Sequence, residues 1–409
     1  MPYKLSTITL AVTGVLLAGV AVAADMQDQS SGNNAVDQGV INAGGFEIKP
    51  RLSMALGRND NVGLTPGDKT AATFTSLSPD ITVGMPTHGQ LYSAHYSGTY
   101  TRFSGDSIDN FNNHNFGLAA DNVWSSRLNS LVNLDYIKGH DGRNALLFQN
   151  LELWHTTGLN GKVHYGADNA QGQFELAAGQ ISKRYDTNHA LAGGLGNTAL
   201  YNNDQTDLKG TFFYKVAPAT HMIVEAENTK YSYVDAYSKN TLGLDSTEQR
   251  LMAGVKWDAT AKTSGSFKMG RLNKSFDLGL QPTGSSTVWD GNVTWSPRTY
   301  SKVNASLIQT ANEFGGTGSF IISRDTNLSW THDWATYITS ALNFGDGVDN
   351  FQGNTNRVDK RRTYGLTFSH AINRWLNGGV GYQNNKRNST NTLFSYTQSV
   401  VMVTLDGTL

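Results

Sequence analysis

The sequence predicts an all-β protein: a transmembrane, antiparallel, up-and-down β-barrel of about 18 strands, with about 16 as the alternative count. Two observations predict this fold. Apolar and polar residues alternate strictly over segments of about ten residues, as in strands with lipid on one side and water on the other. An aromatic residue, a short turn and a new alternating segment also recur along the chain. Aromatic residues repeated in this way mark a membrane–water boundary.

The composition fits a wall that faces lipid. Charged residues make up 16% of the 409 residues, whereas soluble domains usually carry about 25%. The formal net charge of -1 gives no indication of nucleic-acid binding. There is no cysteine, so we expect no disulfide framework. Beyond the first segment no apolar run reaches about 18 residues, which excludes helical membrane spans.

The first segment, residues 1–23, has the pattern of a signal peptide. Lys4 precedes an apolar stretch over residues 10–22, and Ala21 and Ala23 form a small-residue cleavage site. We therefore expect export and cleavage near Ala23. Export without a helical anchor leaves the periplasm, the extracellular space or the outer membrane. The barrel pattern makes the outer membrane of a Gram-negative bacterium the expected location.

A polar segment precedes the barrel. Residues 24–45 are small and polar with no apolar period, so we expect a flexible periplasmic segment. The alternation begins at Phe46, and residues 46–409 are expected to form the barrel. The expected strands cover residues 46–58, 70–85, 89–103, 114–124, 127–138, 158–167, 172–185, 206–216, 220–231, 247–257, 263–276, 286–295, 301–311, 319–332, 335–345, 360–369, 375–384 and 392–405.

The connections alternate between short turns and long loops, and this alternation predicts how the barrel is oriented in the membrane. Short turns of outer-membrane barrels face the periplasm and long loops face outside. The long loops are expected at residues 139–157, 186–205, 232–246 and 346–359. The recurring aromatic residues lie near the short turns and are expected to form a periplasmic aromatic girdle. These residues are Trp124, Tyr214, Trp257, Trp295, Trp330, Trp334, Phe368 and Trp375.

The polar phase of each strand predicts the lining of the lumen. Positive and negative charges are nearly balanced there, whereas a pore for a polyanion should show a dominant ladder of Arg and Lys. The structural alternative is that mixed charges form ion pairs that stiffen the wall. Phe213 and Tyr337 are on the inner phase and are candidates for stacking on sugars. Tyr92, Tyr96 and Tyr100 are expected to face lipid. The lining candidates are Lys49, Arg51, Asp121, Asp135, Glu175, Lys209, Phe213, Glu225, Glu227, Glu248, Arg250, Lys256, Lys268, Asp290, Lys302, Asp325, Tyr337 and Arg361.

A series of motifs runs through the first strands. In order these are Lys49-Pro-Arg-Leu52, Arg58-Asn-Asp-Asn-Val62, Ser76-Leu-Ser-Pro79, Tyr96-Ser-Gly-Thr-Tyr-Thr-Arg-Phe103, the acidic loop 106–109 and Asn113-His-Asn-Phe116. In this order they resemble the start of the putative β-barrel porin 2 family. The resemblance covers residues 48 to 118 and implies an outer-membrane protein associated with production of exopolysaccharide or capsule. It implies no catalytic residue.

The resemblance favours a pore without chemistry of its own. We expect passage or export of an extracellular or capsular polysaccharide, with outer-membrane lipid, the polysaccharide and a periplasmic or inner-membrane synthesis complex as partners. No cofactor is expected, since the chain has no nucleotide-binding motif, and no nucleic-acid partner. The alternative within the same class is a general diffusion porin for small hydrophilic solutes. An inward-folded loop at 139–157 or 186–205 would favour that alternative.

Other classes of protein fit less well. An enzyme would need a nucleophile beside a base, but Ser97 and His95 are separated by about 7 Å along one strand, too far for a direct hydrogen bond. A structural barrel would not conduct ions. A metal site would require the outer loops around His140, Asp186 and His189 to meet, and none is expected.

Overall fold

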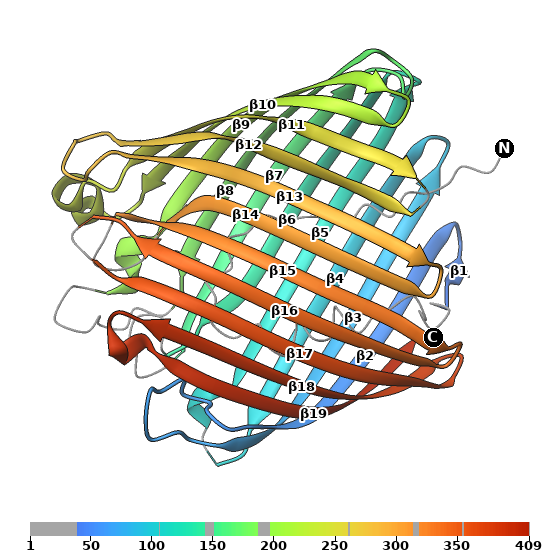
Figure 1. The fold of residues 1–409 in the computed structure, drawn as a ribbon, viewed down its shortest axis with the longest axis vertical. Coiled ribbons are helices and arrows are strands. Elements are labelled where there is room, and N and C mark those ends of the chain that lie inside the picture. The colour runs from blue at the N-terminus through green and yellow to red at the C-terminus, as the bar shows by residue number, and fades with distance from the viewer. Residues whose placement is uncertain are drawn as a thin grey trace.

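The structure is a computed structural model that describes residues 39–105, 107–143, 151–186, 197–260, 262–313, 319–353 and 356–408. The expected signal peptide lies outside the described residues. One antiparallel sheet forms a closed barrel of 18 strands, β2 to β19, each paired with its neighbour in sequence (Figure 1). Pairing of β19 with β2 closes the ring. The predicted fold and strand number are therefore confirmed.

The barrel strands are β2 (Phe46–Asn59), β3 (Ala72–Thr87), β4 (Gln90–Phe103), β5 (Phe111–Ser125), β6 (Leu128–Asp141), β7 (Glu152–Tyr165), β8 (Gly172–Tyr185), β9 (Asn203–Ala217), β10 (Thr220–Tyr233), β11 (Ser246–Thr260), β12 (Thr263–Phe276), β13 (Gly284–Arg298), β14 (Ser301–Glu313), β15 (Phe320–Ala335), β16 (Ile338–Phe351), β17 (Val358–Asn373), β18 (Leu376–Ser389) and β19 (Tyr396–Thr408). Short helical turns are η1 (Ser107–Asp109), η3 (Thr198–Tyr201), η4 (Ser238–Leu242) and η5 (Thr392–Phe394). In the described part of the chain, no helix is long and apolar enough to cross a membrane.

A further short strand corrects the expectation for the segment before the barrel. Residues 24–38 lie outside the described residues. The end of the segment, however, has regular structure, because β1 (Ile41–Ala43) forms a hairpin with the start of β2. β1 pairs with Phe46–Ile48 of β2, whereas β19 pairs with β2 only from Arg51 onward. The hairpin thus covers the part of β2 that extends beyond the closing strand.

Many of the strands are longer than the sequence indicates, and β7 is the clearest case. It begins at Glu152 rather than at residue 158, and its added residues pair with β6 over Tyr136–Asp141. Polar residues occupy both faces of this part of β7, so the apolar–polar alternation is lost although the backbone pairing continues. Alternation is needed only where the outer face meets lipid.

The outer face is apolar, as the exposure pattern shows. In β2 the side chains of Leu52, Met54 and Leu56 are exposed, while Ser53 and Ala55 between them are buried. Cross-strand partners share a face, and this pattern continues around the ring. Tyr92, Tyr96 and Tyr100 lie on the outer face, opposite residues such as Phe116 and Leu77.

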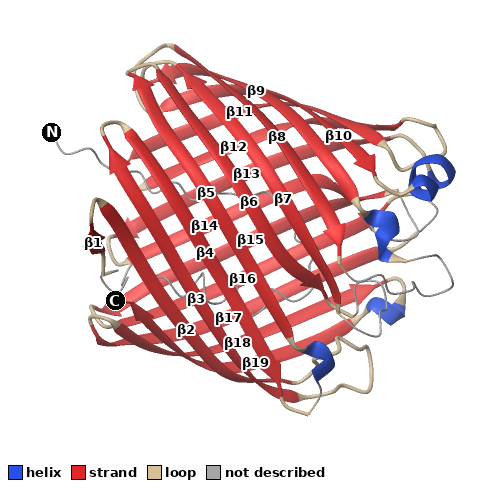
Figure 2. Cartoon of the chain, turned by 180° about the vertical axis from the view of Figure 1, so that it is seen from behind, coloured by secondary structure: helices blue, strands red, loops and turns tan. Residues whose placement is uncertain are grey.

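The two ends of the barrel differ. At one end, the short-turn end, only a few residues join successive strands; at the other, the long-loop end, the connections carry the short helical turns (Figure 2). β2 begins and β19 ends at the short-turn end. All the residues of the expected aromatic girdle lie at this end, and Trp124, Trp334 and Trp375 are among the most exposed apolar side chains.

β11 and β12 approach closely at two glycines. A methyl group on Gly254 would overlap the backbone carbonyl of Phe267, and one on Gly270 would overlap that of Leu251. These overlaps involve backbone atoms of a hydrogen-bonded pair, so no side chain can move to relieve them. Only glycine allows this spacing of β11 and β12.

We therefore expect Gly270→Ala to destabilise the folded barrel, by about 1–3 kcal/mol or more, because the strands must separate locally. The matched control is Gly161→Ala on β7, where a methyl group meets no atom within 4 Å. The folded fraction can be measured by the mobility of unheated samples in gel electrophoresis. Equal folded yields for the two variants would contradict the close approach.

Candidate pore lining

The inner face of the wall is identified by register, because directly opposite residues on neighbouring strands point to the same face. Lys268 lies opposite Asp290, and the adjacent Phe267 and Met269 are exposed on the outer face. The same reasoning applies around the ring. The inner face carries Lys49, Arg51, Asp121, Asp135, Glu175, Lys209, Phe213, Glu225, Glu227, Glu248, Arg250, Lys256, Lys268, Asp290, Lys302, Asp325 and Arg361.

Tyr337 is the exception among the predicted lining residues. It lies in the turn between β15 and β16, and its ring packs edge-on against His370 with ring centroids 5.4 Å apart. His370 has the phase of the exposed Phe368, which places the pair on the outer side. The prediction of an inner position is wrong because the register shifts between Asp333 and Ala335, and such an irregularity reverses the phase of the next residues along the chain.

Many inner charges are paired, first of all on β10 to β13. Lys268 Nζ lies 3.1 Å from both carboxylate oxygens of Glu225 and 3.2 Å from Asp290 Oδ2. Thr211 Oγ1 donates to Glu225 Oε2 over 3.3 Å. Towards the long-loop end, Arg250 donates to Glu248 Oε1 over 2.7 Å. Several of these contacts span neighbouring strands and therefore brace the wall.

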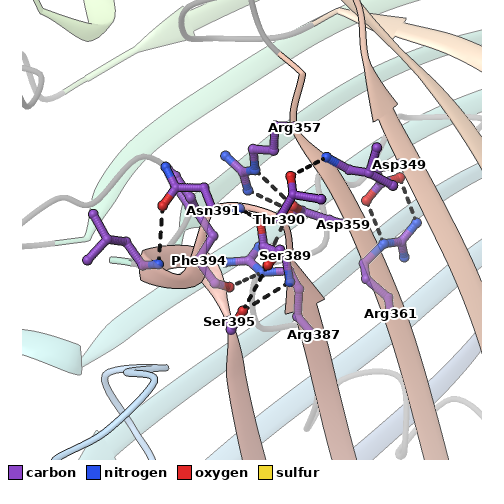
Figure 3. A network of polar contacts seen from close by, with 12 residues as sticks. Asp349, Arg357, Asp359, Arg361, Arg387, Ser389, Thr390, Asn391, Phe394 and Ser395 are labelled. Carbon is purple, nitrogen blue, oxygen red and sulfur yellow. Dashed lines mark hydrogen bonds and ion pairs between the residues drawn. The ribbon is translucent and has the colours of Figure 1, made fainter.

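A second paired group lies on the inner face of β15 to β18 (Figure 3). Arg361 donates to Asp325 over 2.8 Å and to Asp349 over 2.7 Å. Nearer the loops, Arg357 makes a two-point contact with Asp359, at 2.9 and 2.5 Å. Each guanidinium is thus held by carboxylates of the same wall. The structural alternative for the mixed charges, that they stiffen the barrel, describes these residues.

Other inner charges have no ion pair among the described residues, and these are the ones available to passing ions. Lys209, Lys256 and Lys302 belong to this group. Lys256 and Lys215 both lie directly opposite His221, on either side of it, near the short-turn end. Lys215, His221 and Lys256 thus form a local cluster of basic side chains near the short-turn end.

The described loops pack against the inner face at the long-loop end, which sequence reasoning missed. Tyr201 of η3 joins a buried cluster with Tyr185 and Tyr233, both inner-face residues. In the same region Thr198 Oγ1 donates to Glu152 Oε2 over 3.0 Å. Burial raises the pKa of Tyr201 to about 12, so its hydroxyl stays neutral. Part of the loop 186–205 is therefore folded into the mouth.

A second loop packs inward from another part of the ring. Phe394 of η5 lies between two arginines, with the Arg357 guanidinium carbon 3.4 Å from the ring centroid. Arg387, an inner-face residue, donates from Nε to the Phe394 carbonyl over 2.6 Å (Figure 3). Glu152 could have been placed on the inner face from the sequence, because it lies ten residues before Lys162 and the alternation of β7 gives both the same face. Nothing local in the sequence places Tyr201 or Phe394 at the inner face.

The described part of the structure gives no support to the enzyme or metal site considered from the sequence. His95 Nε2 lies 2.9 Å from Asp80 Oδ2, so this histidine is hydrogen-bonded to a carboxylate of the inner wall. Among the described residues, no group of three or more His, Asp or Glu side chains could hold a metal ion. The metal alternative involved His189, which lies outside the described residues.

Comparison with known proteins extends the resemblance found in the first strands. Residues 36–408 match the family model described as putative beta-barrel porin 2. A search of curated proteins found no match.

Solved structures with a similar fold include outer-membrane channels. A BenF-like porin from Pseudomonas fluorescens Pf-5 matches with a TM-score of 0.47 at 10% identity, over 88% of this chain and 99% of that one. OccAB2 from Acinetobacter baumannii matches with a TM-score of 0.45 at 11% identity, over 88% and 97%. The FrpB iron transporter from Neisseria meningitidis (F3-3 variant) matches with a TM-score of 0.42 at 10% identity, over 83% of this chain and 62% of FrpB. This chain thus spans less than two thirds of FrpB.

The paired inner charges lead to a stability prediction. Arg361→Gln would leave Asp325 and Asp349 without their shared cation, and we expect a loss of about 2–3 kcal/mol. The loss is below that of a fully buried pair because 23% of the Arg361 side chain is exposed. Lys302→Gln is the control, since Lys302 forms no ion pair with a described residue. Urea unfolding followed by Trp fluorescence measures both, and equal midpoints would contradict a bracing role for Arg361.

The unpaired inner charges lead to a selectivity prediction. Lys256→Glu should move the reversal potential across a salt gradient towards cation selectivity, because the side chain is exposed to the lumen and its neighbours Lys215 and His221 offer no compensating anion. Lys230→Glu makes the same charge change on the outer face of β10 and should leave the reversal potential unchanged. The prediction fails if both variants, or neither, alter it.

Proposed function

This chain belongs to the putative β-barrel porin 2 family, and we propose that it is a passive channel for small hydrophilic solutes in the outer membrane of a Gram-negative bacterium. Barrels of 16–18 strands enclose an aqueous channel. The inner wall is polar and the outer face carries exposed apolar residues. The short-turn end is assigned to the periplasm and the long-loop end to the exterior, following the usual arrangement.

The observation that carries this proposal is the inward packing of loops at the long-loop end. η3 contacts the inner-face residues Glu152 and Tyr185, and η5 contacts Arg387. Structured loop residues inside the mouth reduce the width available to a solute. Such a constriction suits discrimination between small molecules by size and charge.

The inner wall also supports small solutes over a sugar polymer. Of the predicted candidates for stacking on sugars, Phe213 alone lies inward, and its ring is tilted by 51° to that of His164, with centroids 6.5 Å apart. The inner-face tyrosines Tyr185 and Tyr233 are buried. Tyr337 and the three tyrosines of β4 lie on the outer side. Polysaccharide export, which the family resemblance implied, would in addition require a synthesis complex to drive the polymer. Export of a polymer and diffusion of small solutes differ in the size of solute that can cross a membrane containing the protein.

Swelling of liposomes that contain the purified protein tests the proposal. We expect fast swelling in monosaccharides, with rates that fall steeply from disaccharides to longer oligosaccharides. Liposomes without protein are the control. Release of an entrapped long glucan at a rate similar to that of small sugars would contradict a small-solute channel and favour polymer export.

Tyr201→Ala tests whether the packed loop sets the size limit. Removing this buried ring from the cluster with Tyr185 and Tyr233 should loosen η3 and raise the relative rate for oligosaccharides. Tyr237→Ala is the matched control, because Tyr237 precedes η4 at the same end and its side chain is exposed. An unchanged size dependence in Tyr201→Ala would show that the constriction lies elsewhere.

A further inference from the structure

The outer face carries an unusual set of charges on β15 to β18. Arg324, Lys360, Arg362 and Lys386 all have the outward phase and are exposed. We call these four residues the basic patch. On the outward phase of these described strands there is one carboxylate, Asp346, whose Oδ1 lies 3.2 Å from Arg362 Nε. The patch therefore has excess positive charge on the side of the wall that faces the membrane.

Register brings the four cations close together. Arg324 and Lys360 lie opposite Val348 from either side, and Arg362 lies directly opposite Lys386. Neighbouring strands are about 4.8 Å apart, and the two rows are separated by two residues, about 7 Å. Like charges placed directly opposite each other destabilise a strand pair. An anion bound between Arg362 and Lys386 would remove this repulsion.

The position of the patch indicates which anion. Tyr364, an exposed outer-face residue, lies two residues below Arg362 on the same strand, about 7 Å away towards the short-turn end. Below it the outward side chains of β17 and β18, such as Leu366 and Val380, are apolar. The patch therefore sits at the upper border of the apolar band, at the height of lipid headgroups on the exterior side.

Other outward cations near the long-loop end are arranged differently. Arg184 on β8 is 2.6 Å from Asp204, and Lys138 on β6 is 3.7 Å from Asp186. Their charges are compensated by the protein itself. Lys230 on β10 is a single cation between Thr206 and Thr247. Arg58 on β2, Arg102 on β4 and Arg271 on β12 also point outward, but none of them lies directly opposite a second Lys or Arg. Among the described outward residues, Arg362 and Lys386 are the pair of cations that lie directly opposite each other.

We propose that the basic patch binds a phosphorylated glycolipid of the outer leaflet, with a headgroup phosphate between Arg362 and Lys386 and the acyl chains along the apolar residues below. Arg and Lys are the usual partners of phosphate, through charge-assisted hydrogen bonds. Basic clusters at a membrane surface bind anionic headgroups by the same interaction. The proposal relies on the assigned outer-membrane orientation but is independent of what the channel transports.

Lipid binding by the detergent-purified protein tests this. The probes are lipopolysaccharide lacking its polymer chain, and the same molecule with its phosphates removed. Native mass spectrometry should show that R362Q/K386Q binds the phosphorylated probe at least tenfold more weakly than the unsubstituted protein. Lys386→Arg should retain binding. Lys230→Gln, which removes an isolated outward cation, should change binding less than twofold. Gel mobility of unheated samples verifies that each variant is folded.

Thermal unfolding provides a second readout that a merely structural role would not produce. Without lipid, the double variant should be about as stable as the unsubstituted protein. The removal of two opposed like charges offsets the loss of the exposed Arg362–Asp346 ion pair, which contributes little. With the phosphorylated probe, only proteins with an intact patch should gain stability. Equal binding by the double variant, equal binding of the dephosphorylated probe, or equal protection by inorganic phosphate alone would each overturn the proposal. Solute flux enters none of these measurements, so they can fail while the channel proposal stands.

Discussion

The closure of the sheet by β19 and β2 is the constraint on which the rest of the structure depends. In an apolar membrane every backbone N–H and C=O group needs a partner within the protein, and a sheet without edges supplies one for each. Closure also fixes the faces, since each strand must present one phase to lipid and the other to water. An ion pair crosses the closing strands on the water side, where Arg51 lies 3.2 Å from Asp406.

As a consequence, many charged residues are paired on the inner face, whereas those in the basic patch of the outer face are largely unpaired. On the inner face, acids and bases lie within reach across strands, and residues such as Lys268 and Arg361 are held by two carboxylates each. On the described outer face the middle of the wall is apolar, and the outward charges of β15 to β18 lie towards the long-loop end. There, the basic patch has too few carboxylates of its own. A ligand from outside the protein is the simplest source of the missing negative charge.

The function that we propose depends on the same difference between the inner and outer faces. A polar interior and a lipid-facing exterior make a channel, while the loops that pack on Tyr185 and Arg387 narrow its mouth. Such a design needs no reacting group. In the channel that we propose, selection is by size, by the unpaired lysines and by the fixed loop residues, and the direction of transport follows the concentration of the solute.

The sequence by itself determined the fold, the strand number and the face on which most side chains lie, because the two-residue period of a strand is a local property. Lys49, Phe213 and Arg361 could be placed on the inner face in this way. Tertiary structure decided what depends on register and on loops. Tyr337 left the inner phase at an irregularity, and Tyr201 entered the mouth by packing that no local pattern encodes. Partners such as Arg51 and Asp406, far apart in the chain, meet only because the barrel closes.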